Sequence, residues 1–283
     1  MNACRVADLT HTHPTFLAML LQQPAESPYD VRFQLFGFPT RISWSFWLVA
    51  LVLGYEFSRF TDLIFADAGT SPGAFALLLV WVICMAVSIL IHELGHAIAF
   101  RRYGVESSIV LYYLGGLAIP FAAFRGSRSF RSPGSREELI IAAAGPALQI
   151  GSALIVVLIA WMLGYRTLFL SMMPGPMAEL GQWIDGREFD NAVTFALVNF
   201  YVWPSVCWGV LNLLPVLPLD GGRIAKSIIE MQGGQVVTAL WLSVITAALI
   251  ALYGFNTQQH FLGFFFASLA VSNYQSIQPG NSW

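Results

Sequence analysis

Six long apolar segments set the strongest limit on what this chain can fold into. Each is close to the roughly 20 residues that a helix needs to cross the hydrocarbon of a bilayer. Of all residues, 57% are hydrophobic and 11% are charged, whereas about a quarter are charged in a soluble domain. The polar residues 1–30 are expected to form a flexible tail, followed by one integral membrane domain at 31–283. We therefore expect an all-α polytopic membrane protein with six transmembrane helices, at about residues 44–61, 74–100, 138–164, 191–214, 236–254 and 260–277.

Two further segments are expected to form strands instead of spans, giving a small membrane-associated hairpin or sheet. Apolar and polar residues alternate over Val31–Trp44, which is typical of a strand or two at the membrane surface. Ser107–Phe124 is apolar enough to cross, but Gly115-Gly116 and Pro120 interrupt it. We expect a re-entrant strand or hairpin there, since irregular backbone at membrane depth must be covered by protein or line a cavity.

The positive charges agree with six spans and a cytoplasmic N-terminus, because cytoplasmic loops carry an excess of Lys and Arg. A seventh span at Ser107–Phe124 would move the arginines between Arg125 and Arg136 to the opposite side. Both termini are therefore expected in the cytoplasm. The net charge of −2 gives no basic surface for nucleic acid. The cytoplasmic side would hold Arg5, Arg32, Arg41, Arg101, Arg102, Arg125, Arg128, Arg131, Arg136, Arg223 and Lys226, and the other side Arg59, Arg166 and Arg187.

The motif His92-Glu93-x-x-His96 lies inside the second apolar segment. Residues four apart share one helix face, so the two histidines can bind one metal ion. Glu93 borders the same site, where it can take a proton from water that the metal activates. The alternative is two core histidines with Glu93 as a paired acid. Three ionisable groups in five residues would then each need a partner in hydrocarbon, which favours a functional metal site.

A third ligand is needed, and Asp220 is the acid best placed to supply it. It is the only acid between Asn191 and Glu230, and it follows two prolines that break the preceding helix. With six spans, His96 and Asp220 both lie near the cytoplasmic end of a helix, whereas a seventh span would place them about 30 Å apart. The alternative for Asp220 is a turn residue in Pro-x-Asp-Gly.

Two other polar or irregular positions have open interpretations. Asn212 either ends its helix or donates a hydrogen bond to a substrate carbonyl or its oxyanion. Gly145-Pro146-Ala147 lies in mid-span, and we favour a proline kink with small-residue packing. Gln149, just after it, is assigned no role.

Taken together, these motifs resemble the site-2 protease family of intramembrane zinc metalloproteases. The resemblance implies a catalytic core of three helices, about 74–100, 138–164 and 191–231. It also implies one zinc ion per chain bound by His92, His96 and Asp220, with Glu93 as the catalytic base and Asn212 assisting the substrate. The expected activity is peptide-bond hydrolysis in membrane-spanning proteins within the bilayer, as in regulated intramembrane proteolysis. The chain resembles a minimal form, without PDZ or CBS domains.

Two other classes of protein remain as alternatives. A non-proteolytic membrane scaffold or metal-binding sensor could share the fold, but metal binding alone has no use for Glu93. A metal transporter should carry polar residues through both leaflets, and the outer halves of these spans are nearly free of ionisable groups. The sequence predicts neither an oligomeric state nor a particular substrate.

Overall fold

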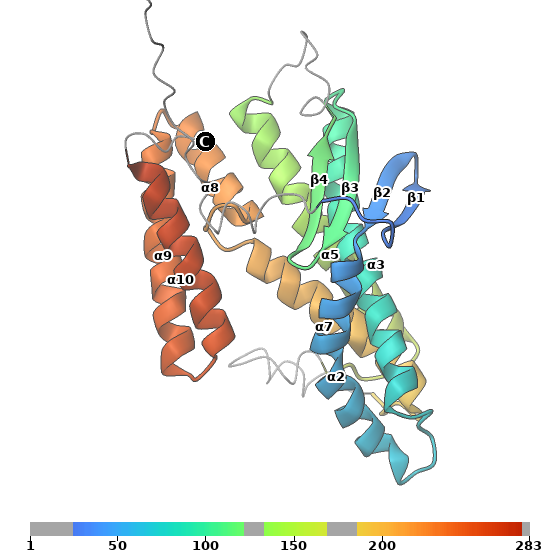
Figure 1. The fold of residues 1–283 in the computed structure, drawn as a ribbon. Coiled ribbons are helices and arrows are strands. Elements are labelled where there is room, and N and C mark those ends of the chain that lie inside the picture. The colour runs from blue at the N-terminus through green and yellow to red at the C-terminus, as the bar shows by residue number, and fades with distance from the viewer. Residues whose placement is uncertain (1–24, 122–132, 169–185, 279–283) are drawn as a thin grey trace, which may run out of the picture.

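The computed structural model describes residues 25–121, 133–168 and 186–278. Over these ranges the chain is mostly helical, with one small four-stranded sheet (Figure 1). Most of the expected tail, residues 1–24, lies outside the described residues. The elements in chain order are β1 (Val31–Leu35), β2 (Phe38–Ile42), α2 (Trp44–Ala66), α3 (Ala74–Arg102), β3 (Ser107–Tyr112), β4 (Gly115–Pro120), α5 (Ser135–Met162), α7 (Ala192–Asn212), α8 (Asp220–Met231), α9 (Val236–Asn256) and α10 (His260–Ile277).

All six segments predicted to cross the membrane are helices. Four of them, α3, α5, α7 and α9, are long and apolar enough to span a bilayer by length and composition. The other two are α2, which contains Glu56, Arg59 and Asp62, and α10, which has 18 residues. The structure therefore confirms the positions of the predicted helices, and six crossings remain a prediction.

Helices α3, α5 and α7 pack against one another and form the centre of the molecule, with α2 beside α3 (Figure 1). Close contact between α3 and α5 requires a glycine, because a Cβ on Gly95 would overlap the backbone at Ala144. Buried aromatic and aliphatic side chains such as Leu77, Ile89 and Phe200 fill the space between α3 and α7. Helices α9 and α10 form a hairpin that stands to one side of this core and contacts it through α8 and the turn before α8.

The sheet has the order β1-β2-β3-β4 and lies at one end of the helices. Strands β1 and β2 are antiparallel, β2 and β3 are parallel, and β3 and β4 form a hairpin through Tyr113 and Leu114. Ile109 and Leu111 of β3 are buried in the main core, and β4 is an edge strand that contacts α3. The predicted strands at Val31–Trp44 and the predicted hairpin are therefore present, although residues 122–124 lie outside the described residues.

The break predicted after α7 is also present. Helix α7 ends at Asn212, a turn with Pro215 and Pro218 follows, and α8 runs on to Met231. Gly221 lies so close to this turn that a Cβ would overlap the backbone of residue 213. Helix α8 therefore starts directly against the end of α7 and packs along α5.

Candidate metal centre

Three side chains from two elements converge at the predicted metal site. His92 and His96 come from α3, and Asp220 is the first residue of α8. Asp220 Oδ2 is 3.1 Å from His92 Nε2 and 3.2 Å from His96 Nε2, and the two Nε2 atoms are 3.1 Å apart. All three residues are buried. The structure thus brings together proposed ligands that are up to 128 residues apart in the sequence.

The outer nitrogens of both histidines face hydrogen-bond acceptors. His92 Nδ1 is 2.8 Å from Gln149 Oε1, and His96 Nδ1 is 2.7 Å from the carbonyl oxygen of Ile141. A carbonyl oxygen only accepts, so each Nδ1 carries the proton and each Nε2 presents its lone pair. This is the arrangement in which histidine binds a metal, with the second nitrogen donating to a fixed partner.

The donor set fits zinc. Catalytic zinc sites use three protein ligands from His, Asp or Glu and leave a fourth position open. Zinc bonds of about 2.0 to 2.2 Å in a tetrahedron place the ligand atoms about 3.3 Å apart. The spacing between the two Nε2 atoms and Asp220 Oδ2, 3.1 to 3.2 Å, is close to that value. Among the described residues, this trio is the one group of His, Cys, Asp and Glu that could hold a metal ion.

Asp220 is oriented by its second oxygen. Its Oδ1 lies 3.5 Å from Arg223 Nη1 and its Oδ2 faces the histidines. Arg223 is held in turn by Glu138 near the start of α5, with two nitrogens 2.8 Å from one carboxylate oxygen. The pair Arg223–Glu138 therefore joins α8 to α5 and turns the carboxylate of Asp220 toward α3.

Two glycines make room for the side chains of the motif. A Cβ on Gly116 of β4 would overlap the carboxylate of Glu93, and a Cβ on Gly145 of α5 would overlap the imidazole of His96. Glu93 is therefore enclosed between α3 and the edge strand, next to His92. The small-residue packing predicted for Gly145 is present, and the group that it packs against is His96.

Comparison with known proteins gives the family. The model of peptidase family M50 matches residues 80–253, which is more than half of the chain. The chain belongs to peptidase family M50. The resemblance to site-2 proteases is confirmed, and with its apolar helices the chain is an integral membrane member of this metalloprotease family.

Three curated relatives are named as zinc metalloproteases, two of them as putative ones. A putative zinc metalloprotease, sll0528, of Synechocystis sp. is 31% identical over 71% of this chain and 44% of its own length. The putative zinc metalloprotease Rip3 of Mycobacterium tuberculosis is 28% identical over 72% of this chain and 44% of its own. The zinc metalloprotease MJ0392 of Methanocaldococcus jannaschii is 28% identical over 54% of this chain and 35% of its own. The chain thus spans less than half the length of these relatives.

One solved structure is also similar to this M50 chain. It is the site-2 protease from Methanocaldococcus jannaschii, at 22% sequence identity and a TM-score of 0.49, covering 88% of this chain and 96% of that one.

Asn212 lies at the end of α7, as both of its interpretations required. It is mostly buried, and its Nδ2 donates to the carbonyl oxygen of Trp208, 3.0 Å away. This contact uses one of the two amide hydrogens of the side chain. It supports the helix-ending interpretation, and a contact with substrate remains a prediction for this residue.

Sequence reasoning missed two residues that contact the proposed ligands, Gln149 and Arg223. Gln149 is a polar residue within an apolar segment, and such residues are costly in a membrane unless they have a partner. The sequence therefore indicated that Gln149 has a polar partner, although it did not indicate which one. Arg223 lies three residues after Asp220, a spacing that places the two side chains on neighbouring positions of one helix.

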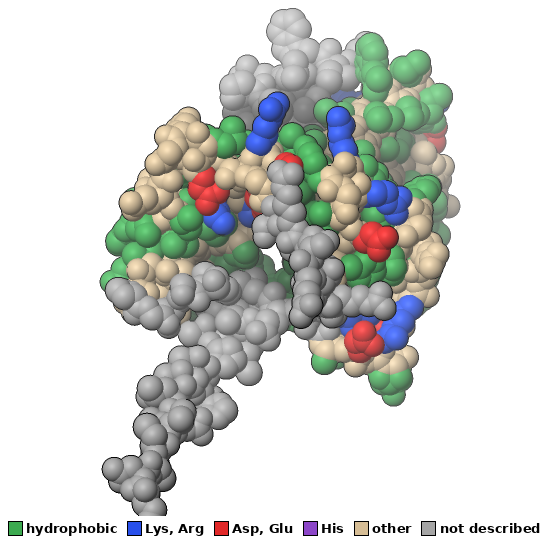
Figure 2. Space-filling model, turned by 90° about the horizontal axis from the view of Figure 1, so that it is seen from above, with side chains coloured by type: hydrophobic (Ala, Val, Ile, Leu, Met, Phe, Trp, Pro, Cys, Tyr) green, Lys and Arg blue, Asp and Glu red, His purple; other side chains and the backbone are tan. Residues whose placement is uncertain are grey.

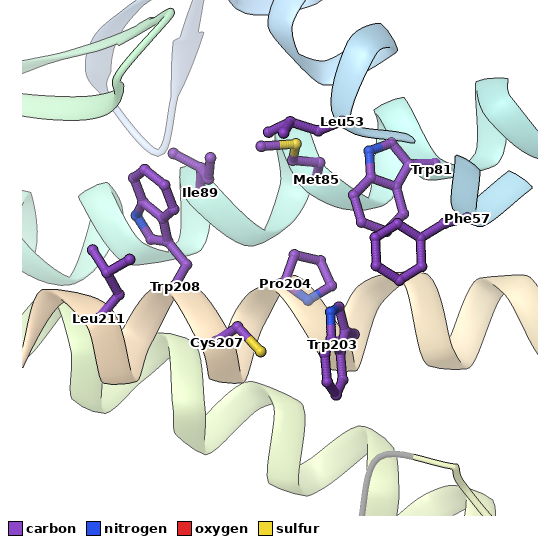
Figure 3. Close-up of a pocket in the computed structure, with 10 residues that line it drawn as sticks. All are labelled: Leu53, Phe57, Trp81, Met85, Ile89, Trp203, Pro204, Cys207, Trp208 and Leu211. Carbon is purple, nitrogen blue, oxygen red and sulfur yellow. The ribbon is translucent and has the colours of Figure 1, made fainter. Parts of the chain in front are cut away.

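An apolar groove in this M50 chain lies along three helices (Figure 3). Its walls come from α2, α3 and α7, and include the stacked rings of Phe57 and Trp81 at one end. At the other end Trp208 lies beside Ile89 (Figure 3) and so close to Gly115 that a Cβ there would overlap its ring. The groove therefore ends at the β3–β4 hairpin, one residue from the glycine that contacts Glu93.

Proposed function

We propose that this chain is a zinc metalloprotease that hydrolyses peptide bonds of membrane-spanning proteins within the bilayer. The observation that carries the proposal is the convergence of two histidine Nε2 atoms and one carboxylate oxygen, with Glu93 beside them. We infer one zinc ion per chain, bound by His92, His96 and Asp220. Buried ionisable groups at membrane depth are expected only where they have such a task.

When bound there, zinc supplies a Lewis acid that acidifies water and polarises a carbonyl. Glu93 accepts the proton as the general base and returns it to the leaving amine. Gln149 and the Ile141 carbonyl hold the two imidazoles in the metal-binding tautomer, and Arg223 orients Asp220.

Two features support a membrane-spanning substrate. The apolar groove between α2, α3 and α7 suits a transmembrane helix, because apolar side chains line it. The peptide bonds of such a helix are shielded by their own hydrogen bonds and must be unwound before cleavage. Strand β4 is an edge strand next to Glu93, and an extended peptide can pair with such an edge. The substrate would thus lie as a helix in the groove and as a strand along β4.

The topology that we propose has six spans, with α2 and α10 as the first and last, and the site near the cytoplasmic face. Support comes from Arg101 and Arg102, which end α3 less than two turns after His96. Figure 2 looks down on the end of the molecule that carries the sheet and α8, and basic and acidic side chains lie together on that face. Such a site would release the cytoplasmic part of a membrane-anchored protein, as regulated intramembrane proteolysis requires.

The test uses the full chain purified in detergent. Zinc content is measured by elemental analysis, and cleavage is measured on a panel of single-span proteins. We expect close to one zinc per chain and cleavage of at least one substrate. The variant Glu93→Gln should keep zinc and lose cleavage by about 10²- to 10⁴-fold. Cleavage retained in that variant would contradict the role of Glu93. Zinc binding without cleavage of any substrate would instead favour a scaffold or metal sensor.

A further inference from the structure

A chain of buried polar side chains runs from the middle of the helical core to the proposed metal site. We call Ser205 of α7, Ser88 of α3 and Gln149 of α5 the Gln149 relay. Ser205 Oγ is 2.8 Å from Ser88 Oγ, Ser88 Oγ is 2.9 Å from Gln149 Nε2, and Gln149 Oε1 is 2.8 Å from His92 Nδ1. The three relay residues have no exposed surface. Polar groups are expensive in an apolar core, so a continuous set of them requires an explanation.

Ser88 is the acceptor at the centre of the relay. Ser205 Oγ donates to Ser88 Oγ and also faces the carbonyl oxygen of Tyr201 at 2.6 Å. Gln149 Nε2 donates to the same Ser88 Oγ. Both lone pairs of the Ser88 hydroxyl are thus used by donors of the relay.

This sets the orientation of the Gln149 side-chain amide, whose oxygen and nitrogen are assigned from their hydrogen-bond partners. Its Nε2 faces Ser88 and donates, so its Oε1 faces His92 and accepts. His92 must therefore carry its proton on Nδ1, which leaves the lone pair of Nε2 directed at Asp220 and His96.

We propose that Gln149, oriented by Ser88 and Ser205, is a positioning residue that holds His92 in its metal-binding tautomer. The inference rests on the proposed zinc site. The two histidines have different kinds of partner at Nδ1. His96 is held by the backbone carbonyl of Ile141, and His92 by the side chain of Gln149. A substitution can therefore release His92 alone. In a medium of low dielectric constant, a misdirected amide is costly, so the relay imposes one tautomer instead of a mixture.

The experiment measures zinc affinity of the full chain in detergent by competition with a chromophoric chelator, and thermal stability of the metal-free form. Gln149→Met keeps the length of the side chain and removes its acceptor. We expect zinc affinity to fall by about 10- to 100-fold, as for other residues that support a zinc ligand. Gln149→Glu keeps an acceptor toward His92 and should stay within about threefold of the wild type. Cobalt substitution and its visible spectrum report the same change at the ligands.

Ser205→Ala tests the relay away from the site, since it removes the hydroxyl that donates to Ser88 and allows Ser88 and the Gln149 amide to turn. We expect a loss of zinc affinity of about three- to tenfold, below that of Gln149→Met. The matched control is Ser152→Ala on α5. Ser152 Oγ contacts Tyr201 Oη at 2.6 Å and the backbone oxygen of Gln149 at 2.7 Å, but no side chain of the relay. It should leave zinc affinity unchanged.

The outcomes separate this inference from the function on which it rests. A wild-type chain that binds no zinc would overturn the proposed metal site. A wild type that binds zinc, with Gln149→Met and Ser205→Ala binding equally well, would overturn the relay alone. A folded Gln149→Glu with the zinc affinity of Gln149→Met would overturn it too, because the shape of the side chain, and not its hydrogen-bond acceptor, would then determine that affinity. If Gln149→Met does not fold, the comparison of Ser205→Ala with Ser152→Ala decides.

Discussion

Among single residues, Asp220 is the proposed ligand that joins the two halves of the site, because it comes from α8 while both histidines come from α3. Asp220→Asn keeps the shape of the side chain and removes its charge. We expect zinc affinity to fall by more than about 100-fold, beyond the loss seen for residues that only support a ligand, and cleavage to fall with it. Zinc content after desalting measures the effect. Full zinc content and normal cleavage in Asp220→Asn would leave Asp220 as a turn residue.

Gly145 shows how one missing side chain shapes the site. A Cβ at this position would overlap the ring of His96, so Gly145→Ala should displace the imidazole and lower zinc affinity by about tenfold or more. Gly151→Ala is the matched control on the same helix, because nothing lies within 4 Å of a Cβ there. Alanine at that position should leave zinc affinity unchanged and stabilise the helix by up to about 1 kcal/mol. Equal zinc affinity in both variants would show that His96 does not depend on Gly145.

The proposed ligands were predictable from the sequence, and the residues that support them were not. The spacing of His92 and His96 fixes their common helix face, and topology selects Asp220. The contact of Gln149 with His92 depends on how α5 is rotated against α3, and the apolar sequence of α5 does not specify that rotation. A polar side chain in a span predicts a partner, but its identity comes only from the packing of the helices.

At the scale of elements, Asp30 joins the β1–β2 hairpin to the start of α2. Its carboxylate is 2.9 Å from Arg41 Nη1 and accepts from the backbone N–H groups of Ser27 and Trp44. Asp30→Asn removes the carboxylate that contacts the buried guanidinium of Arg41, and we expect a loss of about 2 kcal/mol in the free energy of unfolding. Thermal unfolding in detergent measures this. The control is Asp67→Asn at an exposed position, which should change the free energy of unfolding by less than about 0.5 kcal/mol.

The same contacts predict a pH dependence. Burial alone would raise the pKa of Asp30, but the donors at Ser27, Arg41 and Trp44 outweigh it and hold the pKa below its usual value. The stabilising effect is therefore complete above the unfolded pKa of about 3.9 and is lost as the pH falls through the lower folded value. The stability difference between wild type and Asp30→Asn should shrink over that range. A difference that stays constant between pH 6 and pH 3 would rule out this linkage.

For the helices and strands too, one part of the arrangement was predictable from the sequence and another was not. Every predicted helix is present because the length of an apolar segment is a local property that the sequence states directly. The order of the sheet is not local, since β2 pairs in parallel with β3 across the whole of α2 and α3. Alternation predicted strands at Val31–Trp44 and interruption predicted the hairpin at Ser107–Phe124, but nothing in either segment predicts that they pair with each other.

At the scale of the whole molecule, the site belongs to a core to which the outer helices are attached separately. Helices α3, α5 and α7 pack together and hold the two proposed histidine ligands and their supports. Helices α9 and α10 contact this core through α8 and through the turn before it, where Ser243 and Asn273 bind the backbone of Leu217. A change that shifts the α9–α10 hairpin therefore reaches the site through α8 and the preceding turn, at the point where Asp220 begins the helix. Two contacts with the start of α5 set the position of α8, one between Arg223 and Glu138 and one between Glu230 and Ser135.

The six-span topology makes a prediction for exposed positions between helices. In a chain without its native cysteines, single cysteines are introduced at Asp67 after α2, Gln232 after α8 and Thr257 after α9, all of which are exposed. A membrane-impermeant thiol reagent added to intact cells should label positions 67 and 257, and should label position 232 only after the membrane is opened. The reason is that an odd number of spans separates 232 from each of the other two, and the basic residues favour the cytoplasm for position 232. Labelling of all three positions from outside would contradict α9 as a span. The reverse pattern, with 232 labelled in intact cells and 67 and 257 protected, would place His92, His96 and Asp220 near the outer face instead of the cytoplasmic one.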